Sequence, residues 1–234
     1  MVNIDTVYQK VLAIANKEQR GYITPQEFNL FADQAQLQIF EQYFYDTNQF
    51  SRVPGNQKEY SDMLDVLDEK ISLFKKSHTL NHIGNQQYEL PTDYYKLSTI
   101  STSSGVEIQE VNSKELLSIQ NSYLLKPTIS RPVYYRYERN IDNKYIIEAF
   151  PKELGFTVIA NYVRKPITPQ WNYVVITGDQ AFYDGPNSKQ FELHPSEEGN
   201  LVFKILSLAG ISMGSDIYQL GTQEEIKEIQ QQKQ

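Results

Sequence analysis

Hydrophobic positions in the first third of the chain repeat with a helical period. Residues 4–16 carry an apolar stripe spaced three and four apart, and Gly21 follows as a break. Residues 58–76 repeat in the same way along a narrower seam, with acidic residues on the solvent side. We therefore expect two helices here, which flank a longer helix at residues 24–45.

The helix at residues 24–45 begins with a clear signal. Thr24 can cap it, Pro25 suits the first helical position, and Glu27 completes a capping box. At about 100° per residue, its apolar residues fall on two nearly opposite faces: Phe28, Phe31, Ala32, Ala35, Ile39 and Tyr43 on one, and Leu30, Leu37, Phe40 and Phe44 on the other. A helix with two apolar stripes is normally covered on both sides, either by its own chain or by another copy.

Between residues 87 and 163 the period shortens to about two. Along residues 133–138, for example, Val, Tyr and Tyr alternate with Tyr, Arg and Glu. Such alternation is typical of an antiparallel sheet with one buried face. We expect a short helix at residues 112–120 and strands at residues 87–90, 94–102, 106–111, 133–138, 144–150 and 156–163.

The last third of the chain is less regular. Residues 164–191 hold two early prolines, the only tryptophan, Trp171, and an expected hairpin between Tyr173 and Tyr183. A stretch this long between elements is interpreted as an extended arm. Residues 195–213 are apolar on nearly all sides and predict a buried helix, and Asp216 would cap a final helix with a polar end.

The expected fold class is α+β. N- and C-terminal helices would form a helical bundle, into which an antiparallel β domain and an extended arm are inserted. The expected boundaries are 1–84 for the N-terminal part of the bundle, 85–165 for the β domain, 166–192 for the arm or hairpin, and 193–234 for the C-terminal helices.

Composition narrows the function classes. The net charge of −7 disfavours a protein that grips nucleic acid phosphates. The 17 tyrosines favour interfaces, although tyrosine is also a good strand former. The chain has no cysteine, so disulfides, thiolate zinc sites and cysteine nucleophiles are excluded. No apolar run is long enough to span a membrane, and we expect no membrane partner.

Candidate catalytic and metal-binding residues are few. His78 and His82 are spaced four apart, as helical metal ligands can be, but they have no third ligand nearby, and a polar helix end explains them as well. His194 could act as a base, yet no nucleophile motif accompanies it. We therefore expect no catalytic residue, no metal and no cofactor, and hence no enzyme.

A group of tyrosines could stack nucleic acid bases: Tyr94, Tyr95, Tyr134, Tyr135 and Tyr137. The nearby cations are Arg131, Arg136 and Arg139, and Glu138 lies among them. Because base stacking is usually accompanied by a clear positive groove, a role in the core and at interfaces is favoured.

Three sequence blocks resemble the head–neck structural proteins of tailed phages, including crAss-like phages. They are A-N-K-E-Q-R-G-Y-I-T-P-Q-E-F-N at residues 15–29, L-P-T-D-Y-Y at residues 90–95, and the pair N-Y-V-R-K-P at 161–166 and F-E-L-H-P-S at 191–196. The resemblance implies a non-enzymatic head-to-tail connector, a ring or adaptor protein beneath the portal. Members of this family are chiefly helical with a variable β insertion, and are commonly twelvefold.

The resemblance also implies partners and a location. These are other copies of the chain in a ring, the portal protein, and other neck and tail ring proteins, with packaged DNA passing through without specific binding. The protein would be a virion component of the neck, assembled in the cytoplasm of the host bacterium. The candidate interface residues are Phe28, Phe31, Leu37, Phe44, Trp171, Tyr173 and Tyr183.

Alternatives stay open at this point. Trp171 either anchors a partner or fills the core of its own chain. The chain could instead be a nucleic-acid-binding protein that uses the tyrosine-rich sheet, or a hydrolase that uses His194 and a carboxylate.

Overall fold

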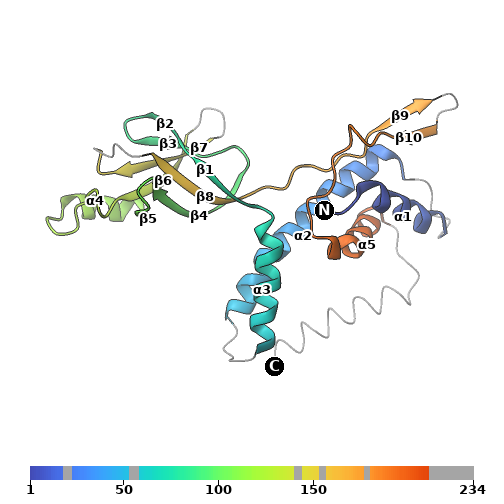
Figure 1. Cartoon of the computed structure of the whole chain (residues 1–234), viewed down its shortest axis with the longest axis horizontal. Coiled ribbons are helices and arrows are strands. Elements are labelled where there is room, and N and C mark those ends of the chain that lie inside the picture. Colours follow the sequence, from blue (N-terminus) through green and yellow to red (C-terminus); the bar gives the residue numbers. More distant parts are fainter. Residues whose placement is uncertain (18–22, 53–57, 140–143, 153–156, 177–179, 211–234) are drawn as a thin grey trace. The chain divides into compact units, whose positions relative to one another are not determined.

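The computed structural model describes residues 1–17, 23–52, 58–139, 144–152, 157–176 and 180–210. The chain forms two compact units (Figure 1). Residues 1–73 and 166–234 belong to the first, which we call the helical unit, and residues 74–165 form the second, the sheet unit.

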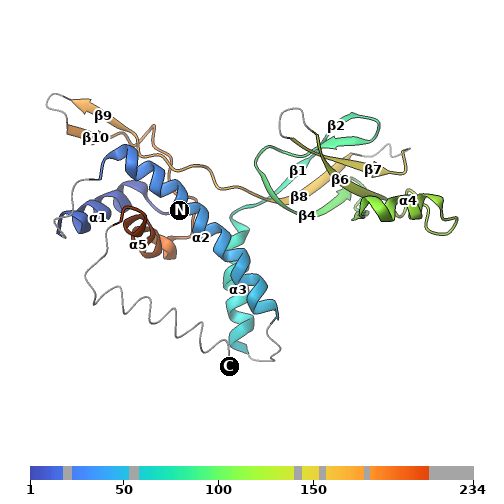
Figure 2. The same cartoon turned by 180° about the vertical axis from the view of Figure 1, so that it is seen from behind.

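The helical unit is built around one long helix, α2. It packs against both α3 and α5, and α1 packs against α5 (Figures 1 and 2). A single 3₁₀ turn, η1, leads into α5. The elements are α1 (Ile4–Lys17), α2 (Pro25–Arg52), α3 (Lys58–Ser72), η1 (Pro195–Glu197) and α5 (Glu198–Leu208).

The predicted start of α2 is confirmed. The Thr24 amide donates to Glu27 Oε2 at 2.9 Å, and the Glu27 amide donates to Thr24 Oγ1 at 3.3 Å, which is the reciprocal capping box. The hydrogen bond from the Thr24 backbone also lowers the pKa of the Glu27 carboxyl. The helix continues past the expected end at Tyr45 to Arg52, because no proline or glycine interrupts it before Pro54.

One predicted face of α2 forms the centre of the helical core. Phe28 and the residues that share its face are buried, apart from the half-exposed Phe31. Side chains from the other helices and the arm complete this core: Ile4, Val7, Val11, Leu67, Ile71, Phe191, Leu193, Leu201, Ile205 and Leu206.

The sheet unit contains one eight-stranded mixed sheet in the order β1-β8-β4-β5-β6-β7-β3-β2. Among the strands, the predicted bounds of β4 and β7 are confirmed. The strands are β1 (Lys75–Thr79), β2 (Asn81–Gly84), β3 (Gln87–Glu89), β4 (Tyr94–Thr102), β5 (Glu107–Glu110), β6 (Val133–Arg139), β7 (Lys144–Phe150) and β8 (Val158–Arg164), with α4 (Ser113–Asn121) between β5 and β6.

The expected fold class, a helical bundle with an inserted antiparallel β domain and an extended arm, is wrong, because the β part is a large, mixed and nearly closed sheet of eight strands. Residues 75–84, where the sequence predicts the end of the helix at 58–76 and no strand, form two further strands of the sheet. In addition, β5 and β6 pair in parallel. Parallel neighbours need a crossover connection, and α4 with its following loop supplies it.

The sheet is nearly closed. In a flat sheet of eight strands the two edges would lie about 34 Å apart, at about 4.8 Å per strand. Here the edge strands β1 and β2 are separated in sequence by Leu80 alone, so the sheet must curl. Its concave side holds the unit's main core: Leu80, Tyr88, Leu90, Ile100, Ile108, Tyr134, Ile147, Ala149, Val158 and Ala160.

The arm at residues 166–193 belongs to the helical unit. The expected hairpin is present as β9 (Tyr173–Ile176) paired with β10 (Gln180–Tyr183). It projects beyond the helices of its unit (Figure 1). The expected buried helix at residues 195–213 is observed as η1 and α5, to Leu208; residues 211–213 and the helix expected from Asp216 lie outside the described residues.

Candidate assembly interface

Within the described residues, the two most exposed large apolar side chains follow α4. Tyr123 is 99% and Leu124 is 78% exposed, and Leu117, Leu125 and Ile129 are exposed beside them. We call residues 117–129, which comprise the end of α4 and the loop after it, the α4 loop. Two hydrogen bonds hold its turn: the Lys126 amide donates to the Ser122 carbonyl at 3.1 Å, and the guanidinium of Arg131 donates to the Leu124 carbonyl at 3.3 Å. An ordered turn therefore presents apolar side chains to solvent.

Sequence reasoning missed the α4 loop. It assigned no element and no role to the segment between the helix expected at residues 112–120 and the strand expected at residues 133–138. The available signal was Tyr123-Leu124-Leu125, three consecutive large apolar residues in a segment with neither helical nor strand period. Such a run on a surface indicates a binding function.

A second exposed apolar stripe follows α2. Leu30 is 71% exposed, Leu37 is also exposed, and Phe44 is half-exposed; the three are spaced seven apart, so they share one line on the helix. Phe40, predicted on this face, is buried and meets Phe44 edge to face at 5.1 Å. Within the described residues, the outer stripe of α2 is thus only partly covered.

Helix α3 repeats this arrangement. Leu67 and Ile71 face the core, whereas Met63, Val66 and Leu73 are exposed. Met63 and Val66 are three residues apart and share one side of the helix, and Leu73 follows its end at Ser72. The helical unit therefore presents apolar stripes on two of its helices.

Trp171 lies inside its own chain. It is 2% exposed, its ring centroid is 4.5 Å from that of Tyr8, and its Nε1 donates to Asp5 at 3.0 Å. Asn29 of α2 bonds both the amide and the carbonyl of Trp171, at 2.7 and 3.1 Å. Phe28, another candidate interface residue, is also fully buried. Neither side chain is accessible to a partner in this structure.

The hairpin β9–β10 carries exposed apolar residues of its own. Tyr173 and Tyr183 are half-buried and stack on Trp171 at 5.8 and 5.7 Å. Val174 and Phe182 are cross-strand neighbours, and both are exposed. A lone two-stranded hairpin is marginally stable in water, so the tryptophan stack at its base is what holds it.

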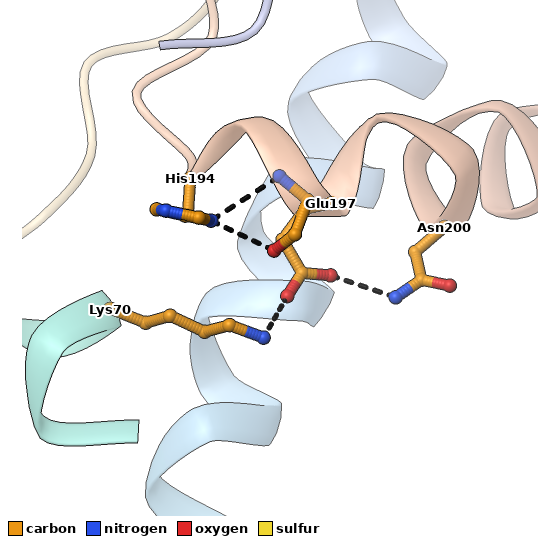
Figure 3. A network of polar contacts seen from close by, with 5 residues as sticks. Lys70, His194, Glu197 and Asn200 are labelled. Carbon is orange, nitrogen blue, oxygen red and sulfur yellow. Dashed lines mark hydrogen bonds and ion pairs between the residues drawn. The ribbon is translucent and has the colours of Figure 1, made fainter. Parts of the chain in front are cut away.

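A buried carboxylate ties α3 to the start of α5 (Figure 3). Glu197 accepts hydrogen bonds from Lys70 Nζ at 2.6 Å and from Asn200 Nδ2 at 2.8 Å. Burial by itself would raise the pKa of Glu197, but these two bonds and the charge of Lys70 outweigh it, so the pKa is lowered. Burial raises the pKa of nearby Asp46. The positive charge of Lys70 opposes this increase, and the negative charge of Glu197 adds to it.

The three histidines considered as metal ligands or as a catalytic base lie in a helix cap and in two strands. His194 Nδ1 accepts from the Ser196 amide at 3.3 Å and shares a 2.8 Å hydrogen bond with the Ser196 hydroxyl, and so caps η1 (Figure 3). His78 lies on β1 and His82 on β2, which removes the helical spacing. In the part of the chain that the structure describes, no group of three or more His, Cys, Asp or Glu side chains could hold a metal ion.

The sheet tyrosines are largely engaged with carboxylates. The Tyr134 hydroxyl donates to Glu110 at 3.3 Å and that of Tyr135 donates to Glu148 at 2.8 Å. Burial and the bond to Glu148 raise the pKa of Tyr135 to about 12. Arg136 is paired with Glu110 at 3.0 Å. This pattern fits poorly with a groove for phosphates, which needs cations that are not already neutralised.

The two units differ in charge. The sheet unit carries 12 Lys and Arg against 9 Asp and Glu, which gives +3. The remaining 10 Lys and Arg and 20 Asp and Glu lie in the helical unit, which gives −10.

No protein-family model matches this chain, and a search of curated proteins found no match. Among the described residues, no helix is both long and apolar enough to cross a membrane.

Proposed function

We propose that this protein is a subunit of the head-to-tail connector of a tailed phage. It would form a ring, or an adaptor within a ring, that joins the portal to the tail around the DNA channel. One observation carries the proposal: contiguous apolar side chains are exposed on both units, above all in the α4 loop.

Isolated apolar residues are common on protein surfaces, but contiguous ones mark contact with a partner. Here they occur on separate elements: the α4 loop, the outer stripes of α2 and α3, and the hairpin β9–β10. A chain with several such surfaces suits an assembly in which each copy has more than one neighbour. A ring subunit has two lateral neighbours and contacts with the rings above and below.

The resemblance to head–neck proteins adds the biological setting. Residues 15–29 end in the first turn of α2, and residues 191–196 lead into η1, so the first similar block and the second half of the paired block belong to the helical unit. From the resemblance come the portal as a neighbour, the commonly twelvefold ring and the location in the virion neck. The charge of −10 on the helical unit suits a surface past which DNA moves without being held.

The proposal is tested by mixing the purified chain with the portal protein encoded in the same genome. Light scattering and electron microscopy should detect a ring on the portal, because many subunits of this kind assemble only on a template. The double variant Leu124→Ser, Leu125→Ser should stay folded and lose this assembly. The matched control Ile167→Ser changes another exposed apolar residue, outside the surfaces described above, and should assemble normally.

Two results would overturn the proposal. One is a chain that stays monomeric and does not bind the portal at any accessible concentration. The other is a doubly substituted α4 loop and a doubly substituted hairpin (Val174→Ser, Phe182→Ser) that both assemble as well as the unmodified chain.

A further inference from the structure

A cleft lies at one end of the sheet. It has a volume of about 300 Å³ and is lined by Tyr94 and Tyr95 of β4, Arg136 and Tyr137 of β6, and Tyr145 of β7. Its origin is the shortness of β5, which separates β4 from β6. Strand β5 pairs with β4 only at residues 100–101 and with β6 only at residues 133–134. Beyond these pairs β4 and β6 have no strand between them, and tyrosine side chains line the space.

The charges described at this cleft are balanced. The guanidinium of Arg136 is paired with Glu110 at 3.0 Å and donates to the Tyr94 hydroxyl at 2.8 Å. Lys144, the residue before Tyr145, is paired with Glu89 at 2.7 Å. A phosphate in the cleft would have to displace or approach Glu110, so an anionic ligand is disfavoured.

The cleft combines aromatic faces with hydrogen-bonding groups. Tyr145 is 45% exposed and meets Tyr94 edge to face, with ring centroids 5.7 Å apart. The Tyr94 hydroxyl accepts a bond from Arg136, which leaves its own proton to donate. Next to it, the Arg136–Glu110 pair offers a donor and an acceptor together. A wholly apolar ligand would cover these polar groups without satisfying them, at a cost in affinity.

We propose that this cleft binds a neutral saccharide. A pyranose ring has apolar C–H faces that can pack on tyrosine rings, and each hydroxyl both donates and accepts, which matches the paired arginine and glutamate. The volume lies at the small end of the range for ligand pockets, about 300–1,000 Å³, so a short saccharide segment fits better than a larger ligand. The inference concerns the sheet unit alone and does not depend on the connector function.

The test is a titration of the full chain with four neutral oligosaccharides: maltotetraose, cellotetraose, mannotetraose and chitotetraose. Saturation-transfer NMR and calorimetry should detect binding of at least one of them. Tyr145→Ala should weaken it at least tenfold, because a stacking face is lost. Tyr145→Phe keeps that face and should retain most of the affinity. The matched control Tyr123→Ala removes a tyrosine that is exposed outside the cleft and should change nothing.

A second variant protects the test against misfolding. Tyr94→Phe removes only the hydroxyl that bonds Arg136 and should weaken binding several-fold with the fold intact. The inference fails if none of the four sugars binds more tightly than about 1 mM, or if binding is the same in Tyr145→Ala. It also fails if a thymidine oligonucleotide or a proline-rich peptide binds in a Tyr145-dependent way while the sugars do not, because the cleft then accepts another ligand class.

Discussion

The helical unit and the sheet unit expose apolar surface in different ways. In the helical unit, exposed apolar residues follow the helical period of α2 and α3 and lie next to or opposite the buried face. Each of these helices therefore has one apolar face in the core and a second apolar face at the surface. In the sheet unit, the largest exposed group sits in one turn, the α4 loop, outside any regular period. Broad helical stripes suit lateral packing between copies, and a compact apolar tip suits insertion into a partner's pocket.

The net charges of the units differ as well: the helical unit carries −10 and the sheet unit +3. The net charge of the chain therefore describes neither unit. Weak binding of nucleic acid, expected from the negative net charge of the whole chain, follows for the helical unit. For the sheet unit, which is positive, the expectation depends on how its own cationic side chains are paired.

The largest effect on stability is expected for Trp171→Ala. The change removes a buried indole that packs on Tyr8 and stacks on the hairpin, which should cost about 3–5 kcal/mol. Scanning calorimetry should show the transition of the helical unit at a lower temperature and that of the sheet unit unmoved. If Trp171→Ala melts like the unmodified chain, the tryptophan does not hold this core.

The matching change in the other unit is Ile147→Ala. Ile147 is fully buried in the concave core of the sheet, and its truncation should cost about 2–5 kcal/mol. Only the sheet transition should move. Equal shifts of both transitions in both variants would show that the units unfold together and would remove the basis for comparing them.

A smaller, pH-dependent effect is expected for Glu197→Gln. Because folding lowers the pKa of Glu197, its ionised form stabilises the helical unit above the ordinary carboxyl range, and this contribution is lost as the pH falls through the folded pKa. At pH 7 the variant should lose roughly 3 kcal/mol, since Lys70 is left without its partner, and at acidic pH it should match the parent.

Asp46→Asn is the control of opposite sign. Folding raises the pKa of Asp46, so its charge opposes folding at neutral pH and this penalty disappears as the pH falls through the raised pKa. The variant should be slightly more stable than the parent at pH 7, measured by thermal melting. A loss of stability there would contradict the assigned direction.

The smallest effect is expected for binding of duplex DNA. Filter binding at physiological salt should give a dissociation constant no tighter than the usual non-specific range, about 10⁻⁴–10⁻⁶ M. Separate measurements on Lys→Gln variants of the sheet unit would sharpen the comparison, because only this unit is positive. A much tighter constant would contradict the idea of a channel that does not hold its cargo.

Local patterns in the sequence predicted local structure well. Alternation gave the bounds of β4 and β7, and the capping box placed the start of α2. The edge strand β1 was not predicted, because all five of its residues are exposed and its sequence shows no alternation of apolar and polar residues. The parallel pairing of β5 with β6 was not predicted. It joins strands on either side of α4, and a local sequence pattern carries no information about such pairing.

The structure places the candidate interface residues partly in the core and partly at the surface. Size and apolar character singled out Trp171 and Phe28, but these properties also make a residue suitable for a core, and both are buried. The second apolar face of α2 was predicted to be covered by the same chain or by another copy, and its residues Leu30 and Leu37 are exposed in this structure. Helical period alone does not separate the two cases, because Phe40 lies on the same face and is buried.

The sheet unit is closed where the chain enters and leaves it. Strands β1 and β8 are antiparallel neighbours, and the Arg164 amide donates to the Phe74 carbonyl at 2.9 Å. The first residue of this unit is therefore hydrogen-bonded to the residue before its last one, Lys165. Residues 74–165 can therefore be exchanged for another domain whose ends are similarly close, or be replaced by a short glycine–serine linker. Neither change requires the backbone of the helical unit to be rerouted. Such an arrangement allows evolution to replace what this unit binds while the helices stay as they are.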